Sequence, residues 1–223
     1  MSSNIEKTRI NNRLPVAREG LPFIFLGVIY TLLFLFLGLE VLATLVGLLC
    51  LFIVCFFRDP ARQNRGSDKT VLSPADGTIL GIHHLENDRN PLGEPAVKIS
   101  VFMSVFNVHV NRIPIMGRIS EIVYSPGKFF SAHLDKASES NEKNLIALQT
   151  EEGRKVVFVQ IAGLIARRIV CWIKEGDHVE AGQRFGLIRF GSRLDVFVPK
   201  DTQITVQPRN KVKAGETILG NLP

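Results

Sequence analysis

The hydrophobic residues are unevenly distributed, and one long run stands out near the start of the chain. This run, Leu21–Phe57, carries a single formal charge, Glu40, and it is longer than the roughly 20 residues that one membrane-spanning helix needs. Gly38 and Glu40 lie near its middle, where a glycine beside a charge favours a turn. The pattern therefore predicts a helical hairpin with halves close to Pro22–Leu37 and Val41–Phe57.

The remainder of the chain, from Arg58 onward, has the pattern of a β-rich domain. Short runs rich in Val, Ile and Phe alternate with turn residues, and no long amphipathic helical pattern competes with them. The predicted strands are Thr78–Ile82, Ala96–Phe102, Val108–Ile113, Arg118–Tyr124, Leu145–Thr150, Lys155–Ile161, Ile169–Ile173, Arg184–Phe190, Leu194–Val198 and Gln203–Val206. We therefore expect a mainly β domain, with a polar loop over Ser131–Asn144.

A weak internal repeat refines this expectation. The segment Val179-Glu-Ala-Gly182 is similar to Val212-Lys-Ala-Gly215, and each returns to a hydrophobic residue soon afterwards. Such repeats occur in barrel-sandwich domains of the biotinyl and lipoyl type. The lysine that those carriers present for modification is absent, so the repeat indicates a barrel-sandwich architecture and not a carrier function.

The pattern divides the chain into a basic N-terminal arm (1–20), a membrane-anchoring hairpin (21–57) and a β domain (58–223). Basic residues flank both ends of the apolar run: Lys7, Arg9, Arg13, Arg18, Arg58, Arg62 and Arg65. The positive-inside bias then puts both ends in the cytoplasm, with the β domain on the cytoplasmic side of the inner membrane. Because each half is short for a full span, a re-entrant or interfacial hairpin remains an alternative. The run is too long for a cleaved signal peptide.

Charge and cysteine content narrow the functional classes. The net charge is +6 and the pI is about 9.4, which favours acidic lipid head groups beside an apolar anchor. Nucleic acid is disfavoured because zinc-finger spacing and arginine-rich runs are absent. The three cysteines, Cys50, Cys55 and Cys171, form no CxxC pair. We therefore expect neither a disulfide framework nor a metal site.

The dipeptide Gly191-Ser192 is the sharpest local feature. It lies between two apolar runs, whereas Gly66-Ser67 lies in a polar linker. The ordinary interpretation is a β-bulge or a tight bend. The functional one is a strained peptide bond whose carbonyl is attacked by the following serine hydroxyl. This attack would form an ester, and β-elimination across the serine would leave a pyruvoyl group on a new N-terminus.

Four stretches, in this order along the chain, relate this hypothesis to a known protein family. They are Leu72–Gly77 (LSPADG), Phe102–Pro114 (FMSVFNVHVNRIP), Gly127–Ala137 (GKFFSAHLDKA) and Phe190–Pro199 (FGSRLDVFVP). With the preceding hydrophobic anchor, they resemble the pyruvoyl-dependent phosphatidylserine decarboxylases, in the short subfamily that includes archaetidylserine decarboxylases. The resemblance extends over nearly the whole chain.

The resemblance implies a role for each motif. Cleavage between Gly191 and Ser192 would convert Ser192 into the pyruvoyl cofactor, and Asp76 and His109 would form the acid–base pair. Each also has an ordinary interpretation: a turn around Asp76 and a core position for His109. Two differences stand out. Longer members have a second histidine where this chain has Arg112, and a threonine after the serine where it has Arg193.

Substrate binding is expected from the third motif and from nearby basic residues. His133 and Lys128 are the candidates in that motif, with Arg167 and Arg168 as further candidates for holding the lipid phosphate. The resemblance implies a Schiff base between the pyruvoyl group and phosphatidylserine, loss of carbon dioxide, and release of phosphatidylethanolamine. The two cleaved chains would remain together as a heterodimer, with a higher oligomer left open.

Two other functions compete with this one. A membrane-anchored β-sandwich adaptor would share the anchor and the Ala-Gly repeat, but it has no use for Asp76, His109 or an interior Gly-Ser. An amino-acid decarboxylase with the same pyruvoyl chemistry would need no anchor. Phosphatidylserine and archaetidylserine present the same head group, so the sequence does not separate these two substrates.

Overall fold

The computed structural model describes residues 10–12, 14–64, 66–87, 89–127, 141–163, 169–189 and 192–223. A short 3-10 turn, η1 (Arg18–Gly20), leads into two helices, α2 (Leu21–Phe36) and α3 (Glu40–Phe56). Gly38 takes a positive φ of 70° in the turn between them, a conformation that glycine adopts without steric cost. The predicted hairpin is thus present, with its turn at the expected glycine.

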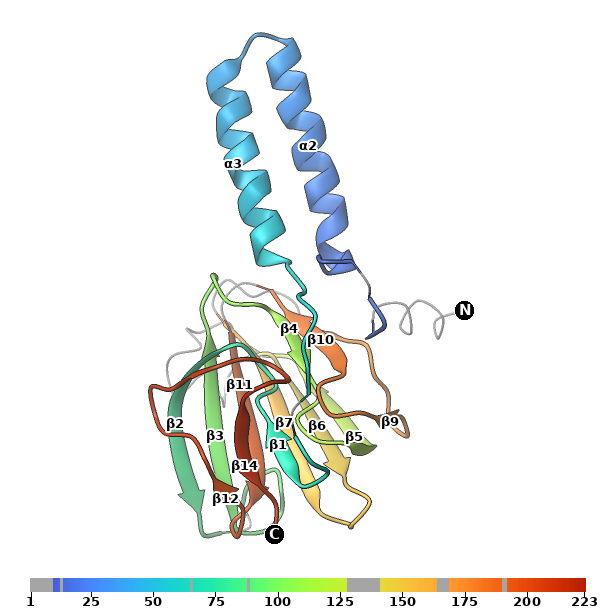
Figure 1. Cartoon of the computed structure of the whole chain (residues 1–223), viewed down its shortest axis with the longest axis vertical. Helices are drawn as coiled ribbons and strands as arrows, with labels where there is room; N and C mark the ends of the chain where they lie inside the picture. The colour runs from blue at the N-terminus through green and yellow to red at the C-terminus, as the bar shows by residue number, and fades with distance from the viewer. Residues whose placement is uncertain are drawn as a thin grey trace.

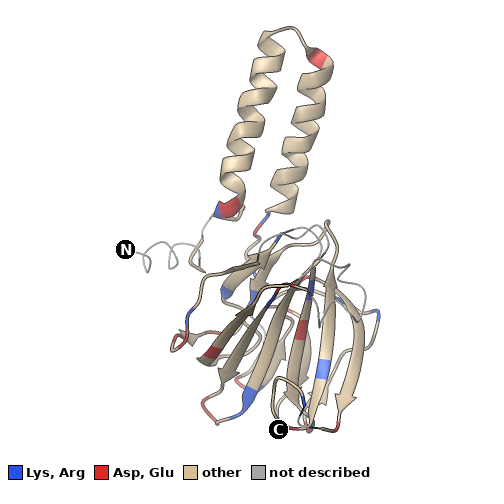
Figure 2. Ribbon diagram, turned by 180° about the vertical axis from the view of Figure 1, so that it is seen from behind, with Lys and Arg blue, Asp and Glu red and all other residues tan. Residues whose placement is uncertain are grey.

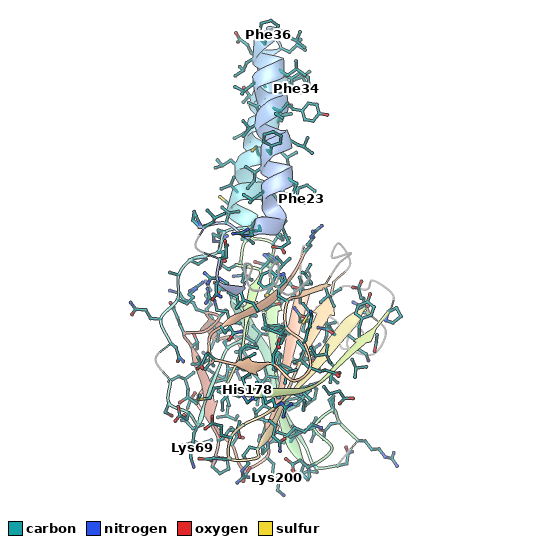
Figure 3. All side chains as sticks on the ribbon, turned by 90° about the vertical axis from the view of Figure 1, so that its right-hand side faces the viewer. Phe23, Phe34, Phe36, Lys69, His178 and Lys200 are labelled. Atoms are coloured by element: carbon teal, nitrogen blue, oxygen red, sulfur yellow. The ribbon has the colours of Figure 1, made fainter. Side chains whose placement is uncertain are left out.

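The hairpin stands away from the β domain as two adjacent antiparallel helices (Figure 1). Charged residues are confined to its base and its tip (Figure 2). Phenylalanines such as Phe23 and Phe34 project from its sides, and Phe36 lies at its tip (Figure 3). The segment Arg18–Phe36 is long and apolar enough to cross a membrane, and Glu40–Phe56 is apolar but shorter. An exposed surface of this kind is costly in water and favourable in lipid.

The domain after the hairpin is mainly β, as the sequence predicts. Its strands are β1 (Thr70–Leu72), β2 (Gly77–Leu85), β3 (Ala96–Met103), β4 (Val110–Arg112), β5 (Gly117–Ser125), β6 (Lys143–Gln149), β7 (Lys155–Ala162), β8 (Ile169–Cys171), β9 (His178–Val179), β10 (Arg184–Ile188), β11 (Ser192–Pro199), β12 (Gln203–Ile204), β13 (Lys211–Val212) and β14 (Ile218–Asn221). One curled eight-stranded sheet has the order β13-β2-β3-β11-β7-β6-β5-β9. Two three-stranded sheets, β1-β14-β12 and β4-β10-β8, complete the domain and share its main hydrophobic core.

The strand order is symmetric about the pair β11 and β7, so the domain consists of two similar halves. Gly77 of β2 pairs with Val212 of β13, and Gly117 of β5 pairs with Val179 of β9 in the same way. The sequence repeat forms the two turns that follow β9 and β13. Gly182 and Gly215 of these turns have φ values of 79° and 72°. The two turns lie against each other, because a Cβ on Gly215 would stand 3.3 Å from the Gly182 Cα.

The two halves differ in how the chain passes through them. One half is continuous, from β4 to β10, whereas the other is split into β1–β3 and β11–β14. In the continuous half a tight turn with a Thr150–Arg154 hydrogen bond joins β6 to β7. In the split half the matching strands, β3 and β11, are joined only through the whole continuous half. After the continuous half, the chain re-enters the split half at Ser192, the first residue of β11.

The base of the hairpin belongs to the packed structure of the domain. Phe56 and Phe57 are buried in a cluster with Ala17 and with Val108 and Trp172 of the domain. The carboxylate of Asp59, just beyond the hairpin, accepts hydrogen bonds at 2.8 and 2.9 Å from Nε of Arg184 and at 3.4 Å from Arg112. The division at residue 57 remains a prediction, and these contacts show that the hairpin base is packed against the domain.

Candidate active site

Ser192 lies at the start of β11, one of the two central strands of the large sheet. It pairs with Met103 of β3 on one side and with Ala162 of β7 on the other, and the register to β3 is unbroken from Ser192 to Pro199. The residue is fully buried, and its Oγ has no hydrogen-bond partner among the described residues. A buried hydroxyl without a partner is costly in a core. Gly191, the other half of the predicted cleavage site, lies outside the described residues.

The residue after Ser192 has a structural role. Arg193 is buried and donates to the Asp195 carboxylate, from Nε at 2.6 Å and Nη2 at 3.1 Å, and Nη2 also donates to Ser100 Oγ at 2.9 Å. Residues two apart on a strand share a face, so this ion pair lies on one face of β11. Ser192 points to the other face with Leu194, a residue of the main core. Arg193, which stands where longer members have threonine, therefore ties β11 to β3.

His109 lies just before β4, in the segment where the chain enters the continuous half. Its imidazole is buried, with its centroid 4.1 Å from that of Phe56, the last residue of α3. Neither ring nitrogen has a hydrogen-bond partner of good geometry among the described residues. Burial lowers the pKa of His109 to about 4, a weak interaction with the Asn107 backbone raises it in part, and the charge of Arg58 lowers it further. The imidazole is therefore neutral near pH 7, with a lone pair on one ring nitrogen.

This depressed pKa predicts an acid-sensitive fold. Between about pH 6.5 and pH 4 the unfolded chain protonates its histidine while the folded chain does not, so stability falls as the pH falls through this window. From pH 7 to pH 5 we expect His109 to contribute a loss of about 2 kcal/mol. Unfolding midpoints in detergent at these two pH values would measure it. The loss should shrink in His109→Gln, and an equal loss in both proteins would contradict the assignment.

Asp76 lies in the turn before β2 and is held by a different set of partners. Its carboxylate accepts hydrogen bonds from Arg62 Nη2 at 2.8 and 3.1 Å and from the Ala214 backbone N–H at 2.7 Å. Arg62 also pairs with Glu216 at 3.4 Å. In the described part of the chain, Asp76 makes no hydrogen bond to His109. The predicted acid–base pair therefore remains a prediction, and the observed partner of Asp76 is an arginine of the linker.

The strand pairing still brings the predicted residues to one end of the sheet. Thr78 at the start of β2 pairs with Phe102, and Phe102 pairs with Arg193. Asp76 and Ser192 therefore flank the same end of β3, and His109 belongs to the connection that leaves this end. Figure 1 shows that this connection, between β3 and β4, rises toward the base of α3. The hairpin and the predicted site lie on the same side of the domain.

Arg112 does not take the place of a catalytic histidine in this arrangement. Its guanidinium donates to the carbonyl oxygens of Gly182 at 2.9 Å and Pro60 at 3.0 Å, and it contacts Asp59. Burial, followed by the neighbouring charge of Arg184, lowers the pKa of Arg112 to about 10, while Asp59 opposes this shift. The side chain stays cationic near pH 7, and it anchors the segment that follows the hairpin.

Several predicted residues cannot be placed, and some contact residues were not predicted. Lys128, His133, Arg167 and Arg168 lie outside the described ranges, as does Gly191. Among the described residues, no three His, Cys, Asp or Glu side chains are grouped so that they could hold a metal ion. The sequence pointed to neither Phe56 nor Arg62. Phe56 sits in an apolar run and Arg62 in a polar linker, so neither carries a local signal of its contact with His109 or Asp76.

Comparison with known proteins gives one consistent result. The family described as phosphatidylserine decarboxylase matches residues 49–220. The phosphatidylserine decarboxylase proenzyme of Syntrophus aciditrophicus is 51% identical over 210 residues, which cover 92% of this chain and 96% of that protein. The proenzyme of Geotalea uraniireducens is 49% identical over 214 residues, which cover 96% of this chain and 99% of that protein.

Proposed function

This chain belongs to the phosphatidylserine decarboxylase family, and we propose that it converts phosphatidylserine to phosphatidylethanolamine with a pyruvoyl group made from its own Ser192. The observation that carries the proposal is the buried, unpaired hydroxyl of Ser192 at the first position of a central strand. Ser192 lies where the chain leaves the continuous half and re-enters the split half. Cleavage before Ser192 would leave the described pairings of β11 from Arg193 onward intact.

Maturation would proceed by reaction of Ser192 with its own backbone. The Oγ attacks the carbonyl carbon of Gly191 and gives its proton to a base, and the peptide C–N bond breaks as the nitrogen is protonated. The resulting ester is then cleaved by loss of the Ser192 α proton and of the Cβ–Oγ bond, which releases Gly191 as a carboxylate. Water replaces the nitrogen of the dehydroalanine that remains, ammonia leaves, and a pyruvoyl group is formed at position 192.

The surroundings of position 192 fit this group. The conversion turns the CH2OH of Ser192 into a methyl group between Met103 and Ala162 of the neighbouring strands, so it removes a buried hydroxyl that has no partner, and it places a ketone oxygen where the backbone N–H was. When formed, the group supplies an electron sink for the loss of carbon dioxide. His109, neutral and without a well-formed hydrogen bond at either ring nitrogen, would take and return protons. Asp76, through its ion pair with Arg62, would hold in place the end of the large sheet at which Ser192 lies.

We further propose that the hairpin holds this site at the cytoplasmic surface of the inner membrane. The exposed apolar helices, the basic residues flanking them and the packing of Phe56 against His109 support this placement. Lys128 and His133 are proposed to bind the lipid head group. The two cleaved chains would stay together through the pairing of β11 with β3 and β7. An intact-mass spectrum tests the core of the proposal, because maturation must yield two chains.

The turn after β3 predicts where the domain touches the bilayer. Phe106 is 75% exposed there, and its carbonyl accepts a hydrogen bond from Arg58 Nη2 at 2.7 Å, at the base of the hairpin. We expect Phe106→Trp to be strongly quenched by brominated lipids in vesicles, because a ring at this position enters the interface. Phe106→Ser should lose several-fold more activity on long-chain vesicles than on short-chain soluble substrate.

A matched control for this prediction lies at the opposite end of the domain. Lys200 is exposed and far from the hairpin (Figure 3), so Lys200→Trp should escape quenching. Both signals are read as differences from the protein that carries only Trp172. Equal quenching at the two positions would show that the turn after β3 does not face the lipid.

A further inference from the structure

A chain of three buried amide side chains leads to the neighbourhood of Ser192. Asn144 Nδ2 donates to Gln160 Oε1 at 3.1 Å, and Gln160 Nε2 donates to Asn111 Oδ1 at 2.9 Å. Asn111 Nδ2 then faces the sulfur of Met103 at 3.6 Å. Each bond fixes the orientation of the next amide, so the terminal donor of the chain is the Nδ2 group of Asn111.

The strand register places this terminal amide above β11. Met103 lies on β3, directly opposite Ser192, and Gln160 lies on β7, directly opposite Leu194. These two strands flank β11 on its two sides. Because the carboxamide of Asn111 contacts both Met103 and Gln160, it spans β11 over the Ser192–Leu194 segment, on the face to which Ser192 points.

The terminal donor has a poor acceptor, while a good acceptor nearby has no donor. A thioether sulfur is a weak hydrogen-bond acceptor, and Asn111 itself is completely buried, so water does not replace it. The Oγ of Ser192 is also completely buried and lacks a partner. We propose that Asn111 is the hydrogen-bond donor that orients the hydroxyl of Ser192 for self-cleavage.

The proposal rests on the proposed function. It gives a role to Asn111, which lies within the second sequence motif but was assigned no role there. A bond from Asn111 Nδ2 to Oγ would leave the hydroxyl proton free for a base and hold the oxygen on one side of the backbone. Orientation of this kind raises the rate of an intramolecular attack without changing its chemistry. Gln160 acts only as a positioning residue, since its amide fixes which end of Asn111 faces β3.

Asn111→Asp tests the proposal with almost no change of shape. The carboxylate keeps an acceptor for Gln160 but loses the donor, so we expect self-cleavage to slow by about tenfold or more, as followed by denaturing gel. Asn111→Leu, which buries no charge, should slow it as well and serves if the aspartate variant folds poorly. Addition of hydroxylamine should not restore cleavage, because the ester that hydroxylamine attacks would not have formed.

Met103→Leu is the matched control, because it removes the sulfur but leaves the amide. If Asn111 acts on Ser192, this variant should mature at the wild-type rate. Slowing of Met103→Leu to the same degree as Asn111→Asp would make the amide–thioether contact structural and overturn the proposal. So would wild-type rates in folded Asn111 variants, or full recovery with hydroxylamine. A wild-type protein that stays uncut would instead refute the proposed function.

Discussion

Ser192→Ala is expected to remain a single chain of 223 residues without decarboxylase activity. The wild-type protein should instead separate on a denaturing gel into residues 1–191 and residues 192–223. Alanine offers no hydroxyl for attack on the preceding carbonyl, so neither the ester nor the pyruvoyl group can form. Because Ser192 Oγ makes no described hydrogen bond, its removal should leave folding intact, with an unfolding midpoint close to that of the wild type.

The chemistry of the new terminus provides an independent measurement. The smaller wild-type chain should resist Edman degradation, because a pyruvoyl group has no free amine, and borohydride or hydroxylamine should abolish activity by reacting with its ketone. Ser192→Thr and Ser192→Cys keep a nucleophile and are expected to cleave slowly. Ser67→Ala is the control, since Ser67 also follows a glycine but is hydrogen-bonded to Thr70 in the linker. It should mature normally.

An active wild-type protein that is uncut, with an ordinary serine at position 192, would refute pyruvoyl chemistry in this chain. A protein that is cut into two chains but is inactive on phosphatidylserine would support maturation and contradict the proposed substrate. Archaetidylserine would then be tested, because the two lipids present the same serine phosphate head.

His109→Gln is expected to slow self-cleavage, decarboxylation or both by roughly 10²–10⁴-fold, the usual contribution of a positioned acid–base group. Glutamine is a polar side chain that does not accept a proton near neutral pH, so the loss reports the imidazole's proton transfer. The rate of chain cleavage measures the first reaction. Turnover per mole of cleaved protein measures the second, and this normalisation keeps the two effects apart.

His84→Gln is the control for this substitution, because His84 is exposed on β2. It should leave both rates unchanged. If His109→Gln matures and turns over at wild-type rates, the imidazole is a packing partner of Phe56 and not an acid–base group. A loss of folding would be seen in the unfolding midpoint, and Phe56→Leu would then show how much of it comes from the ring contact.

The strands could be predicted where they lie within runs rich in Val, Ile and Phe. Each of the ten predicted runs overlaps an observed strand, from β2 to β12, because Val, Ile and Phe in short runs favour β structure whatever their partners. The strands β1, β9, β13 and β14 were missed. They have two to four residues each, and their pairing with distant strands defines them more than their composition does.

The site residues, like the strands, could be predicted where the signal is local and not where it depends on distant partners. The sequence singled out Ser192, His109 and Asp76 through motifs and a family resemblance, which preserve residue order and say nothing of side-chain partners. The contacts of Asp76 with Arg62 and of His109 with Phe56 join residues far apart along the chain. Asn111 shows the limit most clearly. Its importance comes from two strands, β3 and β7, that flank Ser192 only in the folded sheet.

What the sequence determined by itself was therefore local: an apolar hairpin with a glycine turn, a β-rich domain with a repeated turn, and a Gly-Ser pair between two apolar runs. Periodicity and turn chemistry act over a few residues, so they can be read without a fold. Only the tertiary structure decided that β3 and β11 pair although one half of the domain separates them along the chain. It also decided that the hairpin base packs on His109 and that three amides lead to Ser192. These are long-range pairings, and they exist only because the folded core brings distant segments together.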